Sequence, residues 1–78
     1  FVGHDSILDR FAHVATNAVV GANVHIGEAV HVGSNSTIRE KVTIGSFSLI
    51  GSGAVVLDSF DEGSIIVGNP ARLLRKNI

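Results

Sequence analysis

An aliphatic residue recurs at every sixth position through most of this 78-residue chain. Ten such positions follow one another without a break: Val2, Leu8, Val14, Val20, Ile26, Val32, Ile38, Ile44, Ile50 and Val56. The next residue is glycine in six of the ten repeats, and the residue four positions after the aliphatic is nearly always small or β-branched. Repetition at a fixed short period is typical of solenoid folds, in which each repeat packs only on its neighbours.

The even period indicates strands, because side chains alternate between two faces of a strand, whereas a helix repeats every 3.6 residues. Glycine after each aliphatic suits the tight backbone of a corner. The small residue fits inside a corner where a larger one would clash. We therefore predict an all-β parallel solenoid over residues 1–61.

The pattern fails after Val56, and a different organisation is expected for residues 62–78. A loop leads into a short apolar strand that ends at Gly68-Asn69-Pro70. Proline suits the first position of a helix, so residues 71–77 are predicted to form a short helix. Its apolar side chains are expected to cover the open end or flank of the solenoid: Leu73, Leu74 and Ile78.

The composition excludes several classes of protein. The net charge is −1 and no basic run occurs, so the chain lacks the electrostatic footprint of a nucleic-acid binder. No apolar run approaches the roughly 20 residues of a membrane span, and no signal-peptide pattern opens the chain, so we expect a cytoplasmic protein. No cysteine is present for a disulfide or a thiolate metal site. Since a monomer this small is marginally stable, self-association is expected.

The hexads resemble those of the hexapeptide-repeat family, whose fold is the left-handed parallel β-helix, a triangular prism with three hexads per coil. The resemblance covers residues 2–61, and the repeat is already running at Val2, so we expect the chain to be part of a longer protein. The string "VGNPAR" at residues 67–72 also resembles the ending of many hexapeptide acyltransferases. Handedness is implied by the resemblance and not by the spacing.

With 18 residues per coil, residues 18 apart should stack about 4.8 Å apart. His13 then lies over His31, and His4 lies over Ala22. His4 and His13 are nine residues apart, which is half a coil, so they should point to opposite sides of the prism. They cannot easily share a site within one chain, but they can share one between two subunits around a threefold axis.

The four histidines differ in what surrounds them. Asp5 follows His4 near a corner, and a carboxylate on one imidazole nitrogen fixes the tautomer and raises basicity at the other. His25 is interpreted as a surface residue. His31 either lines the same groove as His13 or merely stacks on it. A column of small hydroxyl residues is also expected: Thr16, Ser34 and Ser52.

The stretch "VGHDSILDRFAHVATNAVVGANVHIG" is similar to a narrower set, the sialic acid O-acetyltransferase and UDP-4-amino-sugar N-acetyltransferase family. Members carry a His-acid pair at the start of a coil, F-x-H nine residues on, then G-N-V-x-I-G. Here these motifs are His4-Asp5, Phe11-Ala-His13 and the string at residues 22–27. The resemblance implies homotrimers with acetyl-CoA in the groove between neighbouring prisms, and an N-terminal nucleotide-binding-like domain that these residues do not include.

The resemblance also implies roles for individual residues. His4 would be the general base and Asp5 would tune it. His13 would contact the thioester end of acetyl-CoA, and Ser34 and Ser52 would make backbone contacts to this co-substrate. A backbone N–H near Ala22 is a candidate oxyanion donor. The implied reaction is direct acetyl transfer to a sugar amine or hydroxyl, with no metal and no covalent acyl-enzyme, since no cysteine and no serine with a base partner is found.

Two other functions stay open at this point. The chain can be a non-catalytic β-helix fragment or trimerisation scaffold. It can also resemble the zinc-dependent γ-type carbonic anhydrase, which needs three histidines converging across an interface. Against the second, His25 and His31 are six residues apart and so occupy different faces. The sequence does not decide between an amine and a hydroxyl acceptor.

Overall fold

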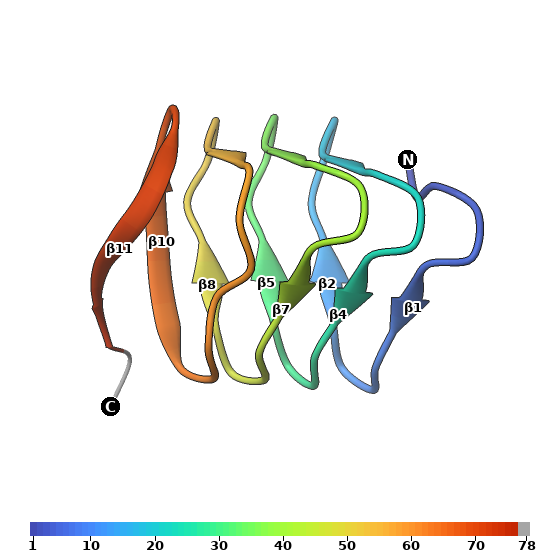
Figure 1. Cartoon of the computed structure of the whole chain (residues 1–78), viewed down its shortest axis with the longest axis horizontal. Coiled ribbons are helices and arrows are strands. Elements are labelled where there is room, and N and C mark those ends of the chain that lie inside the picture. The colour runs from blue at the N-terminus through green and yellow to red at the C-terminus, as the bar shows by residue number, and fades with distance from the viewer. Residues whose placement is uncertain (77–78) are drawn as a thin grey trace.

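The computed structural model describes residues 1–76, and these residues form strands and turns without a helix (Figure 1). No membrane-spanning helix is therefore found in this part of the chain. Nine two-residue strands recur every six residues: β1 (Ile7–Leu8), β2 (His13–Val14), β3 (Val19–Val20), β4 (His25–Ile26), β5 (His31–Val32), β6 (Thr37–Ile38), β7 (Thr43–Ile44), β8 (Leu49–Ile50) and β9 (Val55–Val56). Two longer strands follow, β10 (Ser64–Gly68) and β11 (Ala71–Lys76). The predicted all-β solenoid is confirmed.

The strands form three sheets, which are the three faces of the prism. The first sheet contains β1, β4 and β7, the second contains β2, β5 and β8 extended by β10 and β11, and the third contains β3, β6 and β9. Strands three apart in sequence pair in parallel, with His13 opposite His31 and His31 opposite Leu49. One coil therefore takes 18 residues, as predicted.

Three edges join the sheets, and each is named here after one of its residues. The His4 edge leads from the third sheet to the first, the Asp9 edge from the first to the second, and the Ser34 edge from the second to the third. The turns that form them occupy residues 3–6, 21–24, 39–42 and 57–60 (His4 edge), 9–12, 27–30 and 45–48 (Asp9 edge), and 15–18, 33–36 and 51–54 (Ser34 edge).

The repeating aliphatic residues fill the interior of the prism. From Val20 to Val56 each of them is at most 1% exposed. The small positions lie in the corners, as predicted, and the serines among them bond to nearby backbone: the Ser36 hydroxyl donates to the Gly33 carbonyl at 2.6 Å. No buried polar side-chain atom in residues 1–76 lacks a hydrogen-bond partner. One thin apolar column thus supports the whole prism.

The glycines have a different role from the one expected. Those after the aliphatic residues do not adopt the left-handed backbone. Instead, they allow adjacent coils to approach closely: a Cβ on Gly27 would lie 2.6 Å from the Ser46 backbone nitrogen of the next coil. In the turns up to residues 51–54 the left-handed residue comes two positions later, whereas turn 57–60 has none. The non-glycine cases have φ between 57° and 66°: Asp5, Phe11, Asn17, Asn23, Ala29, Asn35, Lys41 and Phe47. Glycine is thus selected by contact between coils.

The predicted helix over residues 71–77 is wrong. Ala71–Lys76 form β11, which pairs antiparallel with β10 across a two-residue turn at Asn69–Pro70. A helix this short is marginal on its own, whereas β10, which pairs with β8, offers β11 a ready row of backbone partners. Leu73 and Leu74 stay 45% and 54% exposed, so neither closes the prism. Ile66 of β10, which is fully buried, covers the end of the apolar interior instead. Ile78, the third residue of this prediction, lies outside the described residues.

We predict that Gly27→Ala destabilises the prism by about 1–3 kcal/mol, because the new methyl group must displace backbone of the next coil. The control is Ala29→Gly in the same turn, where φ is 57°. Glycine relieves the left-handed backbone there but is freer in the unfolded chain, so the change should stay within about 1 kcal/mol. Urea unfolding followed by circular dichroism measures both. Equal effects of the two substitutions would contradict this account of the glycines.

Candidate functional site

His4 and Asp5 form a contact pair on the His4 edge. The His4 Nδ1 lies 3.2 Å from the Asp5 Oδ2, and both side chains are more than three-quarters exposed. Asp5 adopts the left-handed backbone of the turn, with φ 59°, so consecutive side chains need not point apart as they do in a strand. The contact occupies one imidazole nitrogen and leaves Nε2 free to accept a proton from a bound molecule.

Ala22 lies one coil further along the same edge. The amide of its neighbour Asn23 donates to the His4 carbonyl at 3.0 Å, which fixes the two turns against each other. The Ala22 N–H itself has no hydrogen-bond partner within residues 1–76. The structure thus brings together three of the predicted residues, His4, Asp5 and Ala22, on one edge.

His13 lies in the second sheet, which is the face opposite the His4 edge. Its ring stacks on that of His31, with ring centroids 5.1 Å apart and planes 16° apart. Both side chains are exposed on neighbouring strands in register. A single chain therefore does not unite His13 with His4, in agreement with the half-coil spacing.

Ser34 and Ser52 stack in one column on the Ser34 edge, together with Thr16. Their backbones are linked from coil to coil: Asn35 N donates to the Thr16 carbonyl at 3.0 Å, and Gly53 N donates to the Ser34 carbonyl at 2.9 Å. The amide groups of Ser34 and Ser52 have no such partner among the described residues. The backbone N–H groups of these two serines are therefore able to donate hydrogen bonds to a ligand.

A second His-carboxylate pair was not predicted from the sequence. The His25 Nε2 lies 2.9 Å from the Asp9 Oδ2 at the Asp9 edge, and the two side chains are 47% and 41% exposed. The signal was present but indirect, since Asp9 occupies a position where most repeats have glycine, and it lies 16 residues before His25 in a coil of 18. This pair is shorter and less exposed than the His4–Asp5 pair.

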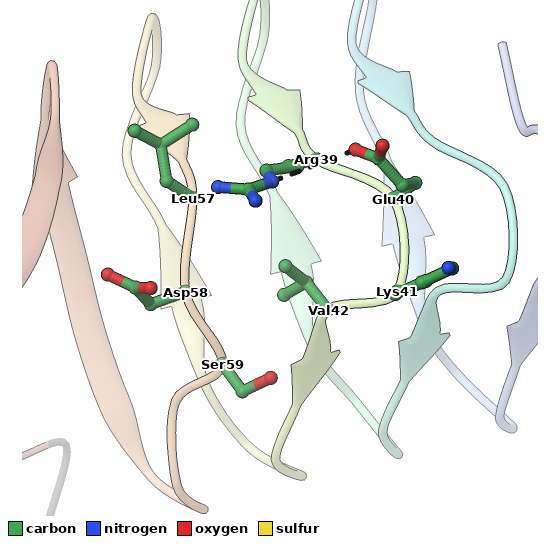
Figure 2. Close-up of a pocket in the computed structure, with 7 residues that line it drawn as sticks. All are labelled: Arg39, Glu40, Lys41, Val42, Leu57, Asp58 and Ser59. Carbon is green, nitrogen blue, oxygen red and sulfur yellow. Dashed lines mark ion pairs between the residues drawn. The ribbon is translucent and has the colours of Figure 1, made fainter.

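A shallow hollow of about 370 Å³ lies further along the His4 edge, between two successive turns (Figure 2). Its lining includes two cations and two carboxylates: Arg39, Glu40, Lys41, Val42, Leu57, Asp58 and Ser59. Glu40 and Asp58 fall in the predicted column of His4, but sequence reasoning gave them no role. Within residues 1–76, no three His, Cys, Asp or Glu side chains are grouped so that they could hold a metal ion.

Comparison with known proteins supports the fold inferred from the hexads. The family model for bacterial transferase hexapeptide (six repeats) matches residues 23–58. The structure resembles a perosamine N-acetyltransferase variant from Caulobacter crescentus, solved with CoA and GDP-perosamine (TM-score 0.93, 25% identity, 96% of this chain and 36% of that one). It also resembles the acetyltransferase domain of PglB from Neisseria gonorrhoeae, solved with acetyl coenzyme A (TM-score 0.89, 37% identity, 91% and 35%).

A third similar structure is LpxA from Acinetobacter baumannii, with a TM-score of 0.92 and 36% identity over 95% of this chain and 29% of that one. The present chain thus spans about a third of the proteins it matches. Residues 23–58 match the hexapeptide-repeat family model, and the fold is the left-handed parallel β-helix that these similar acyltransferase structures share.

We predict that His31→Ala moves the proton resonances of the His13 ring downfield, because a ring stacked at 5.1 Å shields its neighbour. The matched control is His25→Ala, which removes an exposed histidine from another sheet. Proton–carbon correlation spectra of the histidine rings report both. If the His13 resonances respond equally to the two substitutions, the stack does not persist in solution.

Proposed function

We propose that this chain is the β-helix part of an acetyltransferase that moves an acetyl group from acetyl-CoA to an amine or hydroxyl of a sugar or sugar nucleotide. The observation that carries the proposal is the His4–Asp5 contact, which offers a base with one nitrogen oriented and the other free. Two similar structures contain CoA or acetyl coenzyme A, and one of them also contains a sugar nucleotide. The resemblance of the His4 segment to sugar acetyltransferases supports the same conclusion.

The residues suggest a direct transfer. His4 Nε2 takes the proton from the attacking amine or hydroxyl as that group adds to the thioester carbon. The oxyanion that forms is stabilised by a backbone N–H, for which the unpaired amide of Ala22 is placed on the same edge as the base. When the intermediate collapses, the C–S bond breaks, and the CoA thiolate leaves with the proton that His4 held.

The proposed site is composite and needs a homotrimer. His4 and Ala22 lie on one edge, whereas His13, Ser34 and Ser52 lie on the opposite face and the edge that follows it. A threefold arrangement sets the His4 edge of each prism against the second sheet and Ser34 edge of its neighbour, since heterologous contacts close into a ring. Acetyl-CoA would lie in that groove, with its thioester between His4 of one chain and His13 of the next.

We predict that His4→Ala lowers the turnover of acetyl-CoA by roughly 10²–10⁴-fold, the usual contribution of a general base, while CoA binding is largely retained. The control is His25→Ala, which removes the histidine of the other His-carboxylate pair. Consumption of acetyl-CoA is measured against a panel of amino-sugar nucleotides and sialic acids. If His25→Ala abolishes turnover and His4→Ala does not, the base is misassigned. If no panel member is acetylated by the parent protein, the alternative of a non-catalytic scaffold gains support.

The composite site generates a complementation test. His4→Ala and His13→Ala proteins should each be impaired, but unfolding and refolding them together should restore activity. In randomly mixed trimers, about a quarter of the interfaces pair an intact His4 with an intact His13. A mixture of His4→Ala with a His4→Ala, His13→Ala double variant is the control and should stay inactive. A site formed within one chain would give no restoration in either mixture.

A further inference from the structure

The hollow on the His4 edge lies on the same line of the prism as the proposed base. Its residues Arg39, Glu40 and Lys41 form the turn two coils beyond His4, and the intervening turn carries only the short residues Gly21, Ala22 and Asn23. At about 4.8 Å per coil, the hollow is about 10 Å from His4 along the axis. A molecule that reacts at His4 can therefore lie over the small residues and reach the hollow.

The charges in the hollow are unequally engaged. The only ion pair in it that the described residues form joins Arg39 Nε to Glu40 Oε1 at 3.7 Å, beyond hydrogen-bond length. Figure 2 shows the Arg39 guanidinium extending across the gap toward Leu57, while the Asp58 carboxylate points away from it. The terminal nitrogens of Arg39 and the ammonium group of Lys41 thus have no ion-pair partner in residues 1–76. A guanidinium with free terminal nitrogens is suited to bind phosphate.

We propose that this hollow binds the phosphate groups of the acyl donor, with Arg39 as the principal contact and Lys41 as a second cation. This inference rests on the proposed function, because it needs the donor to react at His4. Glu40 then acts against binding: it competes for Arg39 and repels the phosphates. The Glu40 carboxylate therefore lowers the affinity of the hollow for the donor.

The position of the hollow along the prism axis fits the acyl donor better than the sugar acceptor. In prisms that lie side by side around a threefold axis, coils of equal number are level with one another. Ser34 and Ser52 lie in the last turns of the second and third coils, on the Ser34 edge. The turn that contains Arg39 and Lys41 is the first turn of the third coil, on the His4 edge. A donor arm that starts between His4 and His13 and passes the two serines therefore reaches the height of the hollow on the neighbouring chain. The sugar acceptor has only to reach His4.

The test compares the binding of three probes by isothermal titration calorimetry: CoA, pantetheine, which lacks the phosphates, and UDP, which represents the diphosphate of a sugar nucleotide. Arg39→Gln should weaken CoA binding by roughly three- to tenfold and leave pantetheine unaffected. Glu40→Gln should tighten CoA binding, an opposite effect that a merely structural role would not produce. Arg10→Gln, which removes an arginine from the Asp9 edge, is the charge-matched control and should change neither.

The outcomes separate this inference from the proposed function. If the parent protein binds neither CoA nor pantetheine, the proposed function itself fails. If CoA binds but Arg39→Gln and Lys41→Gln leave its affinity unchanged, the hollow is not the phosphate site. Weakening of UDP binding alone would overturn the assignment to the donor. Thermal unfolding of every variant tests whether it is folded. If Arg39→Gln does not fold, Lys41→Gln provides the test of the proposal.

Discussion

The close approach of each turn to the turn one coil further on is the constraint on which the rest of this structure depends. At Gly27 there is no room for a Cβ between adjacent coils, and the same holds for Gly21, which lies against Glu40. Backbone hydrogen bonds then run from coil to coil through strands and turns alike, as between Asn23 and His4. In the repeats that carry these glycines, a one-residue slip would place a side chain where there is no room for one, and this contact helps to hold the register at 18 residues.

The fixed register converts sequence spacing into position on the prism. Residues separated by 18 become neighbours, which is why the rings of His13 and His31 stack. Residues separated by nine, such as His4 and His13, are kept apart for the same reason, and no side-chain movement within a chain brings them together. A fold this regular therefore cannot build a pocket from residues on opposite sides of its own prism. It can do so only by placing two prisms against each other.

Much of the fold followed from the sequence, because the inward positions obey one simple rule. The period and the parallel solenoid were predicted from the hexads, and the position of His13 over His31 followed from the three hexads per coil that the family resemblance implies. The C-terminal helix was wrong, because local helix signals around Pro70 were weighed without the strand edge that β10 presents to the residues that follow. The role of glycine was also misjudged, since a contact with a residue 19 positions later cannot be read from a single turn.

The site was less predictable, because outward side chains are not bound by the repeat. The His25–Asp9 pair joins a strand residue to a turn residue of the previous coil, and its spacing of 16 matches no column. The hollow likewise depends on which way Arg39 and Asp58 extend, and the register does not fix this. Sequence reasoning located the neighbours of each residue but not the direction of long side chains.

The left-handed position of each turn links the fold to the proposed chemistry. Each turn up to residues 51–54 has one residue with positive φ, and asparagine or glycine accepts that backbone most readily. On the His4 edge this position is taken by Asp5, Asn23 and Lys41. Asp tolerates the conformation and contacts His4 from it, and the Lys41 amide donates to the Ala22 carbonyl of the previous coil. Because Phe11, Ala29 and Phe47 hold the same position in other turns, the fold does not prescribe the residue there, and at Lys41 the turn places a cation in the hollow beside Arg39.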